Sequence, residues 1–284
     1  MQRVALFVFA FFVSISSYGQ WQLGLFGGVA NYQGDLVEKA YQSSKGVFGI
    51  SAGYQLSRRI NLRAGLSFAK VAGADSLNKK ADFRLRNFSF QTPITEFSLI
   101  GEFHSFDLEQ KRWSPYIFGG VAVYRFNPYS FDQAGNQVYL QPLGTEGQGL
   151  PGNPDNPYAL TQFAIPFGGG IKFNITDRIR LGLEVGLRKL FTDYLDDVSG
   201  NYADATELLD FRGQRAVDIS YREDEVPGGE PAYPLKGEQR GSPKYKDYYY
   251  FSGLHLIFLL PEGRDGGVGG RAAKKGGYGC PTVF

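Results

Sequence analysis

Apolar and polar positions alternate along residues 178–194 almost without a break. The apolar positions are Ile179, Leu181, Leu183, Val185 and Leu187. The positions between them are arginine, glutamate or glycine. Because successive side chains of a strand face opposite sides, this pattern predicts a strand with one apolar and one charged face. A soluble antiparallel sheet also alternates, but charged residues opposite an apolar row of membrane-spanning length are typical of a transmembrane barrel.

Segments of the same kind recur at residues 22–30, 46–56, 60–69, 88–104, 114–126, 160–173, 178–194 and 247–260. They number eight, and single-chain bacterial barrels have an even number of strands. Short and long connecting segments alternate between them. We therefore predict an all-β fold, an eight-stranded antiparallel transmembrane β-barrel similar to OmpA, with long extracellular loops, short periplasmic turns and both termini in the periplasm. Pro166 removes a ladder donor, so we expect a bulge or a strand rim there.

Charged residues alternate with the apolar ones, so they lie on the opposite face of each predicted strand. The predicted lumen residues are Arg63, Glu96, Glu102, Arg125, Lys172, Arg180, Glu184 and Arg188. An eight-stranded barrel is only wide enough for its own side chains, which favours an ion-paired plug over a conducting path. Five of these residues are basic and three are acidic, so water and hydroxyl groups should complete the network. Val121 and Val123 interrupt the polar row of the fifth segment.

The two ends of the chain differ from the barrel segments. Residues 1–19 contain an arginine, then a short apolar run, and then small residues. This order indicates a signal peptide cleaved before Gln20. Residues 20–260 would then form the outer-membrane barrel, and residues 261–284 a flexible glycine-rich periplasmic tail. The tail carries Arg264, Arg271, Lys274, Lys275 and the single cysteine, Cys280. A lone exported cysteine suggests either an intermolecular disulfide or an unused thiol.

Composition and motifs narrow the function classes. The net charge of +2 argues against nucleic-acid binding. The two histidines, His104 and His255, lie in strand segments, and no nucleophile motif is present. We therefore expect no enzyme activity and no cofactor, although an outer-membrane hydrolase with a serine–histidine pair stays open as an alternative.

Two features of the longest connecting segment suggest further structure. Asp193, Asp196 and Asp197 have a spacing that would suit a calcium ion, or they form a solvated rim instead. Residues 202–222 have apolar positions three and four apart, which predicts one or two short helices interrupted at Gly213. Residues 223–240 are rich in proline, glycine and charge, and we expect them to be mobile.

Five blocks of sequence together resemble a known family. They are residues 26–36, 83–88, 115–128, 165–170 and 181–200, of which the last (LGLEVGLRKLFTDYLDDVSG) is the most specific. The chain resembles PorG, the small outer-membrane barrel of the type IX secretion system of Bacteroidetes. The resemblance implies a role in protein transport with no catalytic residues. It also implies association with a periplasmic ring made of a PorK-like lipoprotein and a PorN-like subunit. The alternative is a stand-alone structural or adhesion barrel of the OmpA type.

The tail suggests how such a partner would be held. Arg271, Lys274 and Lys275 would attract an acidic ring surface, although physiological salt makes each attraction weak. The periplasm permits disulfides, so we expect Cys280 to pair with a cysteine of the ring lipoprotein.

Overall fold

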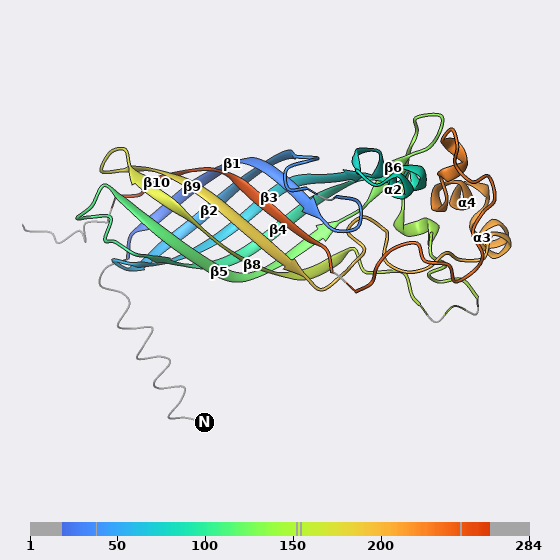
Figure 1. Ribbon diagram of the computed structural model, residues 1–284. Helices are drawn as coiled ribbons and strands as arrows, with labels where there is room; N and C mark the ends of the chain where they lie inside the picture. Colours follow the sequence, from blue (N-terminus) through green and yellow to red (C-terminus); the bar gives the residue numbers. More distant parts are fainter. Residues whose placement is uncertain (1–18, 38, 152, 154, 245, 262–284) are drawn as a thin grey trace, which may run out of the picture.

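The chain forms a closed antiparallel β-barrel extended at one end by a group of folded loops (Figure 1). The structure is a computed structural model that describes residues 19–37, 39–151, 153, 155–244 and 246–261. The barrel strands are β1 (Trp21–Gln33), β2 (Lys45–Ser57), β3 (Ile60–Ala74), β4 (Ser89–His104), β5 (Trp113–Phe126), β8 (Thr161–Asn174), β9 (Ile179–Leu190) and β10 (Tyr248–Leu259). The prediction of an eight-stranded antiparallel barrel is confirmed.

The sheet order closes the ring. Each strand pairs with its sequence neighbour in the barrel, and β1 pairs with β10 from Gln22↔Leu259 to Gln33↔Tyr248. The two ends of the described chain meet at the short turns, where the Leu260 amide donates to the Trp21 carbonyl at 2.9 Å. We call this the short-turn end and the opposite end the long-loop end. All but the last residue of the predicted signal peptide and all but the first residue of the predicted tail lie outside the described residues.

Pro166 does not produce the expected bulge. The β5–β8 ladder pairs Gly119 with Phe167 and resumes at Ala122 with Ala164, in the same register. Pro166 still pairs with Arg188 of β9. The missing donor therefore leaves a short gap on the β5 side only, because β9 holds the strand in place.

The outer wall of the barrel is apolar. Leu25, Phe48, Leu62, Phe97 and Leu183 are each at least 44% exposed, and their neighbours along each strand point into the barrel. A continuous wall of exposed leucine and phenylalanine is not stable against water, and it matches the lipid-facing band of an outer-membrane barrel. Among the described residues, no helix combines the length and the apolar character needed to cross a membrane.

The four long loops fold together into a unit that we call the loop cap, residues 34–44, 75–88, 127–160 and 191–247 (Figure 1). Its elements are α2 (Ala81–Arg86), β6 (Tyr129–Phe131), β7 (Gln137–Tyr139), α3 (Ala205–Arg212) and α4 (Gln214–Ser220), with single turns at Asp75–Leu77, Gln141–Leu143 and Glu223–Glu225. The two helices expected in the longest loop are confirmed. The Asp204 carboxylate caps α3 by accepting from the Thr206 and Glu207 amides, and Gly213, with φ of +84°, separates α3 from α4.

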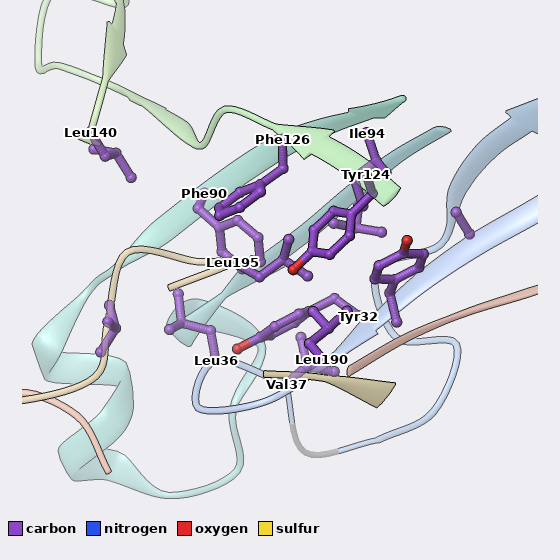
Figure 2. Packing of buried hydrophobic residues seen from close by; sticks show 14 of the residues in the cluster. Tyr32, Leu36, Val37, Phe90, Ile94, Tyr124, Phe126, Leu140, Leu190 and Leu195 are labelled. Carbon is purple, nitrogen blue, oxygen red and sulfur yellow. The ribbon is translucent and has the colours of Figure 1, made fainter. Parts of the chain in front are cut away.

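An aromatic core fills the mouth of the barrel below the loop cap (Figure 2). Tyr32, Phe90, Tyr124 and Phe126 come from β1, β4 and β5 and are at most 2% exposed. Leu195 of the longest loop packs among them, and its carbonyl accepts from the Thr92 hydroxyl at 2.7 Å. The barrel and the loop cap therefore share one core at the long-loop end.

Candidate functional site

The charged residues expected in the lumen lie inside the barrel, with one exception. Arg63, Glu96, Glu102, Lys172, Arg180, Glu184 and Arg188 are each at most 9% exposed. Arg125 is the exception, because it is exposed on the outer wall beside Val121 and Val123, while Ala122, Tyr124 and Phe126 face inward. The assignment of Arg125 to the lumen is wrong. The two valines did not break a polar row, because they belong to the lipid-facing row.

The first ion-pair cluster of the lumen is built around Arg63. Its guanidinium contacts Glu102 at 3.0 Å and Glu184 at 2.9 Å. The Lys172 ammonium contacts Glu102 at 2.5 Å. The Tyr116 hydroxyl donates to Glu184 at 2.6 Å. Because each buried carboxylate has a cation and a further donor, the desolvation cost of burying these charges is offset.

The second cluster lies nearer the long-loop end. Arg188 forms a two-pronged ion pair with Glu96, in which Nε and Nη2 each lie 3.1 Å from a carboxylate oxygen. The Tyr249 hydroxyl donates to Glu96 at 2.6 Å. Phe251 stacks 3.9 Å from the Arg188 guanidinium carbon. The two clusters are joined by strands β9 and β10, so the charged lumen is one layered plug.

The lumen retains very little open space. Two cavities along it have volumes of about 10 and about 30 Å³, and Arg63 and His255 line both. Glycines at the inner face allow this close filling, since a Cβ on Gly168 would lie 2.2 Å from the Val185 carbonyl oxygen. Such cavities hold a water molecule at most.

The lumen contains a serine–histidine pair, but its hydrogen bonds oppose catalysis. Ser51 Oγ lies 3.1 Å from His255 Nε2, and Arg63 Nη1 lies 2.9 Å from His255 Nδ1. An arginine nitrogen can only donate, so Nδ1 accepts and Nε2 carries the proton. The imidazole therefore donates to Ser51 and does not act as its general base. A cavity of about 10 Å³ also leaves no room for a substrate.

Two carboxylates meet at the mouth of the barrel. The Tyr32 hydroxyl oxygen lies 2.5 Å from Asp196 Oδ2 and 2.9 Å from Asp247 Oδ1. Burial raises the pKa of Asp196 well above its usual range, and the nearby Asp247 carboxylate raises it further. Burial likewise raises the pKa of Asp247. Burial and the proximity of two carboxylates therefore both favour the protonated form at this contact.

The other two candidate metal ligands face different partners. Asp197 accepts from the Thr145 and Tyr158 hydroxyls, both at 2.6 Å, and burial raises its pKa to about 6 against the opposing effect of Arg240. Asp193 accepts from Ser199 at 2.8 Å, and burial also raises its pKa to about 6. Within the described part of the chain, no group of three or more acidic, histidine or cysteine side chains has a metal-binding arrangement. These two aspartates act as hydrogen-bond acceptors that hold segments of the loop cap together.

Sequence patterns gave no sign of the arginine that joins these segments of the loop cap. Arg240, which lies in the segment expected to be mobile, is 4% exposed. Its guanidinium contacts Glu146 at 2.9 Å and donates to the Asp197 carbonyl at 2.6 Å. Glu146 and Arg240 are 94 positions apart in the chain, so no local spacing reveals the pair.

The short turns present exposed charge. Their exposed basic residues are Arg58, Arg59, Lys111, Arg112 and Arg178, and their exposed acidic residues are Glu109 and Asp177. The expected partner-binding residues Arg271, Lys274, Lys275 and Cys280 lie outside the described residues.

Comparison with known proteins identifies a family without an assigned activity. The structure is similar to Neisserial surface protein A, with 10% identity, a TM-score of 0.43, and coverage of 86% of this chain and all of that one. It is similar to OprG of Pseudomonas aeruginosa, with 11% identity, a TM-score of 0.41, and coverage of 87% and 100%. No curated protein matches the sequence. The family described as domain of unknown function (DUF6089) matches residues 2–218, and the chain belongs to that family.

Proposed function

We propose that this chain is an outer-membrane barrel of the PorG type, which anchors the periplasmic ring of a type IX secretion system. The observation that carries the proposal is the filled lumen. Arg63, Glu102, Glu184 and Lys172 occupy the interior as a paired network, which leaves no path for solute and no site for substrate. A barrel of this kind acts through its surfaces.

The apolar wall supports the membrane location. It surrounds the barrel between the short turns and the loop cap, and transfer of its leucine and phenylalanine side chains from water to lipid is favourable by about 25 cal/mol per Å². The buried charges face away from this wall, as lipid requires. If the chain is a PorG-type barrel, the short-turn end faces the periplasm and the loop cap faces the exterior.

The positive charge at the short-turn end favours a partner with an anionic surface. Arg58, Arg59 and Arg178 are exposed there, and the positive charges exceed the negative ones. The basic tail residues Arg271 and Lys274 follow the same end of the barrel in the chain. A ring surface with acidic residues would be complementary to both, with complementarity contributing mainly to the rate and orientation of association.

The resemblance to PorG supports assignment to the type IX secretion system in particular. Its most specific block, residues 181–200, supplies Arg188 and Glu184 to the lumen, Asp196 to the contact between the loop cap and β1, and Asp197 to a contact within the loop cap. That block therefore contributes both to the filled lumen and to the attachment of the loop cap, and a filled lumen suits a scaffold and not a pore.

Affinity purification from native membranes tests the proposal. The barrel would carry a tag in the loop cap at Gly135, an exposed turn residue, and bound proteins would be identified by mass spectrometry after gentle solubilisation. A PorK-like lipoprotein and a PorN-like subunit should co-purify. If neither does, and another tagged barrel from the same membrane behaves identically, the stand-alone OmpA-type barrel is the better assignment.

A charge-reversal variant sharpens the test. Arg58→Glu with Arg59→Glu and Arg178→Glu should reduce recovery of the ring proteins, since all three side chains are exposed at the short turns. The matched control reverses Lys39 and Lys79, exposed in the loop cap, and should leave recovery unchanged. Equal loss in both variants would contradict contact through the short-turn end.

A further inference from the structure

A groove opens on the sheet just above the apolar wall at the long-loop end. The β3–β4 ladder continues to Ala74↔Ser89, whereas the β2–β3 ladder begins only at Val47↔Ala69. β6 adds to the projecting sheet through Gln91↔Tyr129. The groove over this projection has a volume of about 410 Å³, large enough for a small polar headgroup.

The groove differs in charge from the other large cavities of the loop cap. Its lining includes the hydroxyl groups of Ser43, Ser44, Ser89, Tyr129 and Ser130, together with Lys45, and no carboxylate. The cavity of about 340 Å³ beside α3 is lined by Glu146, Asp155 and Glu207. The cavity of about 470 Å³ beside α2 is also lined by several carboxylates. Hydroxyl donors and a cation without an acid suit an anion.

Two lysines at the groove have no acidic partner in the part of the chain that the structure describes. The Lys70 ammonium donates to the Tyr129 hydroxyl at 3.1 Å, and Lys45 lines the groove. Among the described residues, no carboxylate forms an ion pair with either lysine. Arg222 also donates to Ser130 at 3.1 Å, although Glu225 balances its charge. The groove therefore has a net positive charge.

The position of the groove indicates what kind of anion it meets. Lys70 follows Phe68 by two positions on the outer face of β3, and Phe68 is 49% exposed on the apolar wall. Lys70 pairs with Pro93 of β4, and Thr95 and Phe97 continue that strand toward the wall. An anion attached to acyl chains would place the chains on Phe68 and Phe97 and the charge at Lys70.

We propose that this groove binds the phosphate group of an anionic membrane lipid in the leaflet at the long-loop end. The proposal rests on the membrane location given under the proposed function. Lys45 and Lys70 supply the positive charge, and Ser43 and one hydroxyl of the Ser89–Ser130 pair supply hydroxyl donors, whereas the Ser44 hydroxyl donates to Asn31. Tyr129 holds Lys70 at the boundary between the groove and the apolar wall.

Lipid retention in nanodiscs tests the inference. The full barrel would be placed in phosphatidylcholine nanodiscs containing a minor fraction of phosphorylated lipid A, then extracted into mild detergent, and the lipid retained would be measured by mass spectrometry. Lys45→Gln with Lys70→Gln should reduce retention about tenfold, equivalent to about 1.4 kcal/mol, because salt screens the attraction between exposed lysines and phosphate. The matched control is Lys189→Gln, which removes an exposed lysine from the outer face of β9, outside the groove.

The outcomes separate the inference from the proposals on which it rests. Equal retention by the wild type and the double variant, or equal loss in the Lys189 control, would overturn the groove assignment. Displacement of the lipid by millimolar inorganic phosphate alone would show a site for free anion instead. A barrel that folds but does not enter nanodiscs would refute the membrane location, whereas the pulldown result bears only on the ring.

Discussion

Glu96 and Arg188 form a two-pronged ion pair across the lumen, from β4 to β9, with both nitrogen–oxygen distances at 3.1 Å. The strands are not neighbours, since β5 and β8 lie between them in the sheet. The pair therefore braces the barrel across its interior, where both side chains are nearly removed from solvent.

Removing one partner of this pair should destabilise the barrel strongly. Glu96→Gln leaves the Arg188 charge buried without a counter-ion, and such changes cost about 3–5 kcal/mol. Urea unfolding in lipid vesicles, followed by the fluorescence of Trp21 and Trp113, would measure the loss. Glu109→Gln, at an exposed turn position, should change the free energy of unfolding by less than about 0.5 kcal/mol. Similar effects of the two variants would show that the pair contributes little.

The filled lumen should not conduct ions. Cavities of about 10 and about 30 Å³ do not join into a path, because the side chains of eight strands occupy the interior. Purified protein in planar bilayers should show no steady conductance. Reproducible open channels in the wild type would refute the plug and restore the pore interpretation.

The two faces of β9 should react with different reagents. Cysteines at Leu183 and Val185 should be labelled from the lipid phase, since both side chains are exposed on the outer wall. Cysteines at Arg180, Glu184 and Arg188 should resist that label, because these positions are buried. The experiment uses a Cys280→Ser background so that only the introduced thiol reacts. Lipid-phase labelling at the three inner positions would invert the assigned orientation.

The loop cap should lose stability as pH rises through the range in which its aspartates ionise. The pKa of Asp193 and the pKa of Asp197 are raised from 3.8 to about 6 by burial. The folded state then holds more protons than the unfolded state, so their contribution is full below about pH 3.8 and is lost by about pH 6. Near-ultraviolet circular dichroism would follow melting of the Tyr158–Tyr194 stack, whose ring centres are 4.7 Å apart.

Asp193→Asn with Asp197→Asn isolates this effect. Subtracting the melting temperature of the variant from that of the wild type at each pH cancels the other titrating groups. The difference should fall between about pH 4 and pH 6 and then stay level. A difference that rises over this range would mean that the aspartates are stabilised as anions.

If the chain anchors a ring as proposed, Cys280 should form a disulfide with a cysteine of the ring lipoprotein. It is the only cysteine in the sequence, so a disulfide at this position must involve another molecule. Non-reducing gels of native membranes should show a higher-mass species that disappears on reduction and in Cys280→Ser. If the wild type runs only as the monomer without reductant, the disulfide prediction is wrong. Any contact of the tail would then depend only on the charges of Arg271, Lys274 and Lys275.

Local periodicity was sufficient for the barrel wall. Leu183 and Glu184 were assigned to opposite faces from the sequence, because strand geometry fixes the direction of each side chain once a strand is recognised. The helices around Gly213 followed from spacing in the same way. The prediction that Arg125 faces the lumen was wrong because apolar residues occupy both faces of its strand. Ala122 and Tyr124 face inward, and Val121 and Val123 face lipid.

Contacts between distant segments were decided only by the tertiary structure. Arg240 joins Glu146 and Asp197, and Tyr32 joins Asp196 and Asp247, across separations that no sequence period encodes. The expectation of a mobile segment at residues 223–240 rested on composition, which cannot reveal that Arg240 gains a buried acidic partner. The sequence by itself determined which face of each well-patterned strand is apolar, because that depends on the backbone alone. Closure of the barrel decided which charges meet across the lumen and which loops fold over its mouth, because those energies arise only when distant residues are brought together.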